Sequence, residues 1–437
     1  MTIKLPRRIR ERGSVLVTTA VAMVGLVSFS ALSIDYGVFW LSRRQAQNSA
    51  DAGALAGAIA LAFDNATDKT VNGPASKNAF AATQANLVFG LPPSVAPATD
   101  ITFNPCSDDN DPNGCIQVKV YRTTARNNAL PTFFARLFGI VSQDIQAYAE
   151  AKAVQGDSTE CMRPWAVLDK WDEYDMATNP GTPESEHLQG SHSPSIIDPD
   201  WNMNQSFDKY CTNGPCTQEN DYYETPALCP PGTTTCDPGT GFRLYDQSNN
   251  PVDYGRQVIL KTGSQNQTSA GWFMPIRLSA SSSGAADYCA DIKQCSGNLN
   301  YIGQTLDVET GNMVGPTAQC VFTDGDSLYN KDPNAHWDPN YFGTGKGAVV
   351  GGNFGPNQSP RIVPIAVINP DSFFAGGPNG STTITISNIL GFFVDSQLGQ
   401  GGQTNTLGYL INVPGLYRGG NTVAPNSTFV KVIQLIR

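Results

Sequence analysis

The sequence predicts an α+β protein with a long N-terminal transmembrane and stalk helix, a small α+β module and a larger β-rich, disulfide-stapled domain. Three observations predict this class. An uncharged apolar stretch continues into alanine-rich sequence, short apolar runs between turn residues fill the remainder, and ten cysteines all lie beyond residue 105. We place the parts at residues 1–13 (a basic cytoplasmic tail), 14–62 (the helix), 63–155 (the small module) and 156–437 (the β-rich exported domain).

The length and composition indicate which classes of partner to expect. A length of 437 residues is enough for two or three domains. The net charge is -10, which argues against nucleic acid as a partner, because neutralising phosphates requires a basic face. The acidity is typical of a soluble exported domain, and scattered calcium sites are the alternative. The 42 glycines and 30 prolines suit short strands joined by many turns.

The first element is a membrane anchor. Five basic residues precede residue 13, and residues 14–34 carry no charge. About 20 helical residues, at roughly 1.5 Å each, cross a hydrocarbon core of about 30 Å. Because basic flanks stay in the cytoplasm, the C-terminal side is expected to be translocated, which predicts a single-pass protein with its mass outside the cytoplasm.

A cleavable signal peptide is the alternative. The uncharged stretch is longer than a typical signal-peptide core of about 7–15 residues, and no A-x-A site follows it. The chain instead continues as helix-forming sequence, with Tyr36 and Trp40 where an interfacial aromatic belt is expected. We therefore expect a retained anchor.

Small residues form a stripe along the second half of this helix. Alanine recurs every four residues from Ala46 to Ala62, and two glycines lie beside that row. Such a face lets another backbone approach closely, although an alanine-rich helix without a partner is the alternative. Glycine inside a helix costs stability, so we expect a packing role, either with other membrane proteins or in self-association. The predicted packing positions are Ala46, Ala50, Gly53, Ala54, Gly57 and Ala58.

The N-terminal sequence as a composite resembles the Tad/Flp pilus-assembly proteins of the TadE/TadG-like type over about residues 10–62. Arg12-Gly13 precedes the apolar span, Asp35 follows it, and Gln45, Gln47 and the alanine block of residues 50–58 come next. The resemblance implies a non-enzymatic component of a type IV-like secretion and adhesion apparatus in the bacterial inner membrane. Its implied partners are other pilus-assembly membrane proteins, and its exported mass lies in the periplasm or beyond.

Two departures from relatives of this family narrow the prediction. Pilins cut by prepilin peptidase usually carry Glu five residues after the cleavage-site Gly, where this chain has Thr18 after Gly13. This argues against processing at Gly13 and against polymerisation as a pilin. There is no Asp-x-Ser-x-Ser motif, so the von Willebrand-type domain of some relatives is not expected.

Alternating residues predict strands in the small module. Residues 75–89 are expected to form a short helix, and residues 101–103 and 116–122 two strands. Residues 131–138 can form a helical turn that begins with proline. Residues 145–154 alternate again and predict a third strand, with helix as an alternative. A long helix followed by a small sheet resembles pilin architecture, as a fold-level analogy only.

The larger region is expected to be a β-sandwich or irregular barrel. Its apolar runs are short, each is bounded by Gly, Pro, Asn or Ser, and no long amphipathic helix is evident. The runs lie at residues 257–261, 272–278, 361–368, 382–386, 389–394 and 428–436.

The cysteines predict a disulfide framework, because an even number on one side of a membrane indicates an oxidising compartment. Free or metal-bound thiols are the alternative, but the Cys-x2-Cys spacing of zinc ribbons is absent. We expect four local pairs and one long-range bridge, although sequence does not determine connectivity. The expected pairs are Cys106/Cys115, Cys211/Cys216, Cys229/Cys236, Cys289/Cys295 and Cys161/Cys320.

One loop is a weak calcium candidate. Asp109, Asp111 and Asn113, followed by Gly114, match the first half of a calcium-binding loop. Position twelve is Val120, where a bidentate Glu is needed, so an acidic hairpin tip is the simpler interpretation. We expect no cofactor apart from this possible cation.

The sequence favours a structural role over an enzymatic one. None of the three histidines accompanies a recognisable nucleophile, and no G-x-S-x-G motif is present. The expected function is a membrane-anchored accessory or structural component of Tad pilus assembly. A membrane-tethered adhesin or glycan-binding module is the alternative, and an exported hydrolase is a third, weaker one.

Overall fold

The computed structural model divides the chain into two compact units, each described here by itself. Unit 1 comprises residues 1–60, 68–152 and 434–437, and unit 2 comprises residues 61–67 and 153–433. The return of the C-terminal residues to unit 1 is not part of the predicted boundaries. The structure describes residues 11–65, 68–108, 115–168, 173–174, 210–211, 221–223, 242, 253–262, 272–279, 284–343, 346–368, 382–398, 405–418 and 428–436.

Helix α1 (Glu11–Phe63) has 53 residues, which corresponds to about 80 Å at 1.5 Å per residue. Its continuity across the apolar and alanine-rich parts confirms the predicted long helix. Within unit 2, the last turn has its carbonyl groups satisfied by asparagine side chains, because such groups lack partners inside a helix. Asn412 Nδ2 donates to Ala62 O at 2.7 Å, and Asn357 Nδ2 donates to Phe63 O.

Unit 1 is a helix-on-sheet module. Helix α2 (Pro74–Ala85) begins with proline in its first turn, and the short helix α3 (Pro97–Asp100) leads into the sheet. The sheet places β2 (Cys115–Arg122) between β1 (Ile101–Asn104) and β5 (Ile145–Gln155), both antiparallel to β2. The predicted strands are confirmed, including a strand rather than a helix over residues 145–154.

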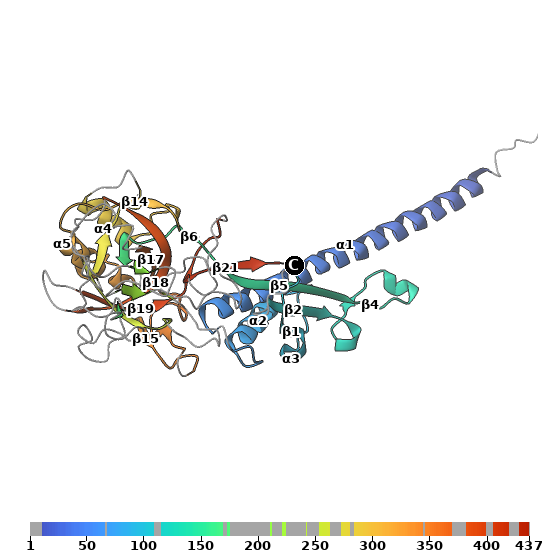
Figure 1. The fold of residues 1–437 in the computed structure, drawn as a ribbon. Helices are drawn as coiled ribbons and strands as arrows, with labels where there is room; N and C mark the ends of the chain where they lie inside the picture. Colours follow the sequence, from blue (N-terminus) through green and yellow to red (C-terminus); the bar gives the residue numbers. More distant parts are fainter. Residues whose placement is uncertain are drawn as a thin grey trace, which may run out of the picture. The chain divides into compact units, whose positions relative to one another are not determined.

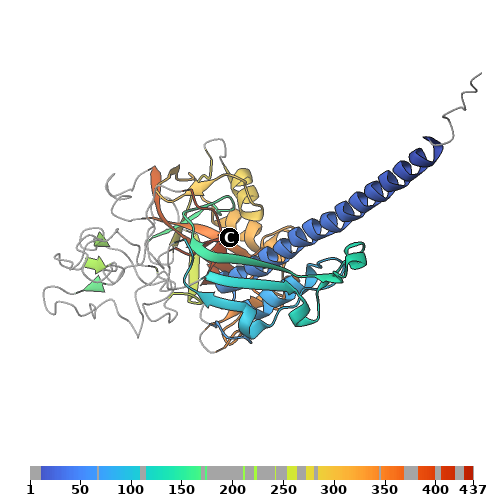
Figure 2. The same cartoon turned by 90° about the vertical axis from the view of Figure 1, so that its right-hand side faces the viewer.

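A hairpin extends the sheet at one end. Strands β3 (Leu130–Pro131) and β4 (Ser142–Gln143) pair antiparallel and enclose the 3-10 helix η2 (Ala135–Phe138). The predicted helical turn therefore begins four residues later than expected, since Pro131 belongs to a strand. A second 3-10 turn, η1 (Thr124–Arg126), follows β2. Figures 1 and 2 both show the hairpin alongside α1.

Unit 2 contains a closed β-barrel, one of the two expected architectures. The strand order is β18-β17-β7-β12-β11-β19, and β19 pairs back onto β18 while β14 adds to the other end of β18. Closure removes free strand edges. The strands are β7 (Trp165–Leu168), β11 (Gln257–Thr262), β12 (Trp272–Pro275), β14 (Thr305–Asp307), β17 (Ile362–Ile368), β18 (Thr383–Leu398) and β19 (Asn405–Ile411).

Strand β18 accounts for two of the predicted runs, because residues 382–386 and 389–394 join into one strand of 16 residues. It pairs with three neighbours and has a register shift between Val394 and Ser396, where a bulge bends the strand. Gly408 on β19 is needed for this pairing, since a Cβ there would overlap Phe393 O.

Unit 2 also contains short elements outside the barrel. Its small strands are β6 (Ser158–Thr159), β8 (Glu173–Tyr174), β9 (Tyr210–Cys211), β10 (Asp221–Tyr223), β13 (Asn300–Tyr301), β15 (His336–Asp338), β16 (Ala348–Val350), β20 (Val413–Pro414) and β21 (Val430–Leu435, whose last two residues belong to unit 1). Its helices are α4 (Ala285–Lys293), α5 (Val314–Ala318), the π-helix η4 (Gln319–Thr323) and the 3-10 turn η5 (Tyr329–Lys331).

The main core of unit 2 lies where the barrel meets α4 and η4. Trp165, Phe392 and Phe393 are fully buried, and the Trp165 indole donates to the Tyr288 hydroxyl at 3.1 Å. Arg361 is also fully buried. Its Nε donates to Val394 O at 2.8 Å, its Nη1 to Asp332 O and Ala335 O at 2.8 and 2.9 Å, and its Nη2 to Asp395 O.

Candidate functional site

The first half of α1 presents apolar side chains without protein contacts. The exposed fraction of large apolar side chains between Val15 and Ile34 is 51% to 71%. Its polar groups bond within the helix: the hydroxyl of Thr19 donates to Val15 O and that of Ser33 to Phe29 O, both at 2.8 Å. This is how hydroxyls are accommodated in hydrocarbon. Among the described residues, only α1 is long and apolar enough to cross a membrane.

The second half of α1 is packed inside unit 1. Ala46, Ala50, Ala54 and Ala58 are at most 1% exposed. At Gly53 an added Cβ would come within 2.5 Å of Thr83 Cγ2 on α2 and 3.1 Å of Val118 Cγ1 on β2.

At Gly57 an added Cβ would overlap Ile116 Cδ1, and it would lie 3.2 Å from the Ala79 Cβ. The stripe therefore permits close approach, but the backbone that approaches is the chain's own. This corrects the expectation that Ala46, Ala50, Gly53, Ala54, Gly57 and Ala58 face another subunit. A periodic pattern defines a packing face but does not identify what covers it.

Polar side chains beside the alanine row also hold α1 to unit 1. Gln45 Oε1 accepts the Phe89 N–H at 2.8 Å, Gln47 Nε2 donates to Tyr148 O at 3.0 Å, and Ser49 Oγ donates to Thr83 O at 3.0 Å. Gln45 and Gln47 are among the residues that carry the family resemblance. Gln45 thus bonds the turn after α2, and Gln47 bonds strand β5, both within unit 1.

Asp35 ends the apolar half and is only 2% exposed. Its carboxylate accepts the backbone N–H groups of Phe133 and Phe134, both at 2.9 Å, and of Ala135 at 2.6 Å. Burial raises the pKa of Asp35, but the three N–H groups lower it further, so the net pKa lies below the ordinary value. Asp35 thus caps η2 as an ionised carboxylate and joins the hairpin to α1.

The disulfides confirm one expected pair and correct two others. Cys106 bonds Cys115, nine residues away, because β1 and β2 bring their ends together. Cys161 bonds Cys295, and Cys289 bonds Cys320.

The pairs Cys289/Cys295 and Cys161/Cys320 are therefore wrong. Cys289 lies inside α4 and faces η4, whereas Cys295 lies past the end of the helix beside the chain entering β7. Two of the three bonds that the structure describes join residues 31 and 134 positions apart. This corrects the scheme of four local pairs with a single long-range bridge.

The two remaining expected pairs, Cys211/Cys216 and Cys229/Cys236, stay predictions. Cys216, Cys229 and Cys236 lie outside the described residues, and Cys211 is described only as the end of β9. Neither pair is therefore confirmed.

The calcium candidate of Asp109, Asp111 and Asn113 also lies outside the described residues. The neighbouring Asp108 accepts from Lys152 Nζ at 2.7 Å. Cys106, Cys115 and Glu150 place their ligand atoms within 4.8 Å of one another, but the two sulfurs are joined in a disulfide. Glu150 is already bonded, accepting from Ser107 N and from the Tyr148 hydroxyl, both at 2.7 Å.

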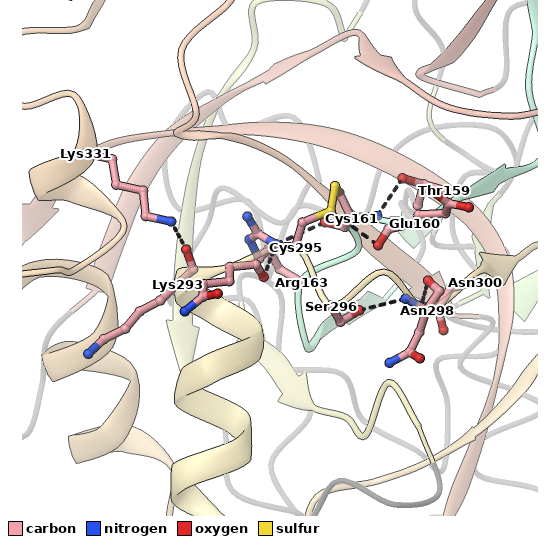
Figure 3. Close-up of a disulfide and its surroundings, with 11 residues drawn as sticks. Thr159, Glu160, Cys161, Arg163, Lys293, Cys295, Ser296, Asn298, Asn300 and Lys331 are labelled. Carbon is pink, nitrogen blue, oxygen red and sulfur yellow. Dashed lines mark hydrogen bonds between the residues drawn. A yellow bond between two sulfur atoms is a disulfide. The ribbon is translucent and has the colours of Figure 1, made fainter.

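A cavity of about 490 Å³ in unit 2 borders the Cys161–Cys295 disulfide, whose polar surroundings are drawn in Figure 3. Arg163 and Lys331 supply its cations, and its remaining lining is mainly Pro360, Ile362, Pro364, Val413, Pro414 and Leu416. Arg163 Nη1 donates to Cys161 O at 3.2 Å and to Gln294 O at 2.8 Å. Burial lowers the pKa of Arg163 to about 10, so it stays protonated at neutral pH. Thr159 and Glu160 also line this cavity.

Two further polar residues of unit 2, His336 and Asn312, make local contacts. His336 lies exposed on β15, where its Nδ1 is 3.1 Å from Asn334 O. Asn312 Oδ1 accepts from Val314 N at 3.1 Å and starts α5, with Gly311 at φ +110°.

Comparison with known proteins gives one result. The family model described as "Putative Flp pilus-assembly TadE/G-like" matches residues 13–60. Comparison with curated proteins and with solved structures found no match. The matched segment covers both halves of α1, from the start of the apolar span to the last residue that packs in unit 1. Residues 13–60 of this chain are thus similar to the TadE/G-like Flp pilus-assembly family, and this similarity supports a role as a component of a Tad system.

Proposed function

We propose that this protein is a single-pass inner-membrane component of Tad (Flp) pilus assembly or tight adherence, with a structural or accessory role. Its N-terminus lies in the cytoplasm, and units 1 and 2 are exported. The observation that carries the proposal is the TadE/G-like match on a helix whose first half is apolar and exposed and whose second half holds a folded unit.

The orientation is supported from both ends. Lys4, Arg7, Arg8, Arg10 and Arg12 precede the apolar half, and basic residues favour the cytoplasmic side. The disulfides beyond the helix favour an oxidising compartment. Alkaline phosphatase fused after residue 437 should be active, and green fluorescent protein fused there should remain dark. The reverse result would contradict the orientation.

Partners in the membrane would meet the exposed half of α1, because the small-residue stripe is buried in unit 1. A photo-crosslinking residue at Val24 or Leu26 should capture other membrane subunits of the pilus machine in living cells. The matched control is Ala54, which is fully buried and should capture none. Crosslinks from Ala54 alone would contradict this arrangement.

Deletion of the gene tests the role itself. The expected result is loss of surface pili and of attachment, both restored by the wild-type gene. A tethered adhesin would instead leave the amount of assembled pili unchanged while attachment falls. That second result would replace the assembly role by the adhesin function.

A further inference from the structure

The hairpin loop of unit 1, residues 132–141, carries an unusual apolar surface, and we name it the apolar hairpin. Its charged residue is Arg136. Apolar side chains exposed in a contiguous patch usually mark an interaction site. The exposed fractions are 51% for Phe133, 36% for Phe134, 83% for Leu137, 79% for Phe138, 52% for Ile140 and 60% for Val141.

The contacts of α1 show which end of unit 1 the apolar hairpin occupies. Going back along the helix, Gly57 faces Ile116 and Gly53 faces Val118. Gln47 then reaches Tyr148, which pairs with Lys119.

Asp35 finally reaches Phe133 in the hairpin. The sheet thus runs along α1 toward its N-terminus, and the apolar hairpin lies where the exposed apolar half of the helix ends. Figures 1 and 2 agree on this placement beside α1.

The apolar hairpin is held in one conformation. Asp35 binds three of its N–H groups, and Thr132 bonds across its neck, with the N–H donating to Val141 O at 3.3 Å and the hydroxyl donating to Ile140 O. Phe133 packs edge-on against Phe89 with ring centroids 6.0 Å apart. The exposed apolar residues are therefore presented by an ordered element.

We infer that the apolar hairpin inserts into the interfacial layer of the bilayer that α1 spans, on the face where the helix emerges. The inference rests on the proposed membrane anchor. Continuity with the apolar half of α1 selects lipid as the occupant. Aromatic and aliphatic side chains suit the border of the hydrocarbon, and Arg136 on the same loop suits the lipid phosphates. Tyr36 and Trp40, 71% and 52% exposed, continue this belt on α1.

Attachment to the bilayer through both α1 and the apolar hairpin would restrict the motion of unit 1. A single helix leaves an exported unit free to rotate and tilt over the membrane. The apolar hairpin adds a second contact with the bilayer and so sets one orientation of unit 1.

Depth-dependent quenching tests the inference on the full chain. Single cysteines at three exposed positions, Phe138→Cys, Val24→Cys and Val71→Cys, would carry an environment-sensitive NBD dye, with the native disulfides kept oxidised. Val24 reports the spanning segment. Val71, 45% exposed, precedes α2 at the end of unit 1 near Gly57, far from the hairpin. The proteins are reconstituted in phosphatidylethanolamine–phosphatidylglycerol vesicles with lipids spin-labelled at shallow or deep positions.

The expected result is strong quenching at 138 by the shallow label, quenching at 24 by the deep label, and little quenching at 71. If the dye at position 24 is quenched but the dye at position 138 is quenched as little as the dye at position 71, insertion of the apolar hairpin would be overturned. The membrane anchor would then still stand. A blue-shifted but unquenched label at 138 would indicate a protein partner or a second copy and would also overturn it. Absence of quenching at position 24 by the deep label would overturn the proposed membrane anchor itself.

Discussion

Units 1 and 2 are held together in different ways. In unit 1 a helix face of small residues packs on the sheet that contains β1, β2 and β5, and the disulfide closes a separation of nine residues. Unit 2 closes a barrel from strands distant in sequence, and its disulfides span 31 and 134 residues. The difference teaches that the disulfide and the β1–β2 pairing of unit 1 join segments close in sequence, whereas the barrel and the disulfides of unit 2 join segments that are far apart.

The largest expected effect comes from the disulfides. In the chain-entropy model, a loop of 134 residues stabilises by about 5 kcal/mol and a loop of nine by about 2.5 kcal/mol. Replacing Cys161 and Cys295 by serine should therefore destabilise unit 2 about twice as much as replacing Cys106 and Cys115 destabilises unit 1. Denaturant unfolding followed by hydrogen exchange of each unit measures both losses. Equal losses of stability in the two units would contradict the difference proposed between them.

Arg361 should come next. The Arg361→Met substitution removes the guanidinium donor from four backbone carbonyl groups, and we expect a loss of about 3 kcal/mol in the free energy of unfolding. Arg418→Met is the matched control, because that exposed guanidinium lies over Tyr301 at 3.6 Å, much as Arg361 lies over Tyr329 at 4.1 Å. The control should lose less than about 1 kcal/mol. Similar losses at both sites would show that the buried carbonyl network contributes little.

Gly57 and Gly25 distinguish the two halves of α1. The Gly57→Leu substitution forces a side chain into Ile116 and should destabilise unit 1 by about 1–3 kcal/mol or prevent docking of the helix. Gly25 has nothing within 4 Å, so Gly25→Leu should leave unit 1 unchanged. Protease resistance of unit 1 in detergent measures the difference. If unit 1 of the Gly57→Leu variant stays as protease-resistant as the wild type, the small-residue stripe would instead face an external partner.

The smallest expected effect is local, at Asp35. A carboxylate with a lowered pKa stabilises the fold above its unfolded pKa of about 3.9, and this contribution is lost as the pH falls through the folded pKa. Amide exchange at Phe134 and Ala135 should therefore accelerate in acid, while exchange in β2 stays slow. Asp35→Asn should show faster exchange already at neutral pH. Identical acid profiles in both proteins would exclude the carboxylate as the cause.

Much of unit 1 follows from the sequence because its signals are local. Alternation in residues 116–122 and 145–154 predicts the strands, and antiparallel pairing then explains the Cys106–Cys115 bond. The sequence does not predict which segment packs on the alanine stripe, since small residues allow any backbone to approach closely. The role of Asp35 had a signal, namely a single carboxylate directly after the apolar span.

Unit 2 resists prediction for the opposite reason. Its apolar runs predict strands, but barrel closure and the joining of two runs into β18 depend on long-range pairing. The Cys289/Cys295 pair fails because sequence proximity ignores the helix between them, which directs the two sulfurs to different neighbours. The cavity beside Arg163 is formed by residues that have no common sequence motif.

The last residues of the chain belong to unit 1, where Ile436 N donates to Glu150 O at 2.8 Å on β5. Nearly all of unit 2 is therefore inserted between one strand and its neighbour. Because synthesis proceeds from the N-terminus, the edge of β5 stays open until the strand β21 has been made. Maturation of unit 1 is thus timed by completion of unit 2, and a chain stalled within the barrel leaves a tethered protein with an unpaired strand.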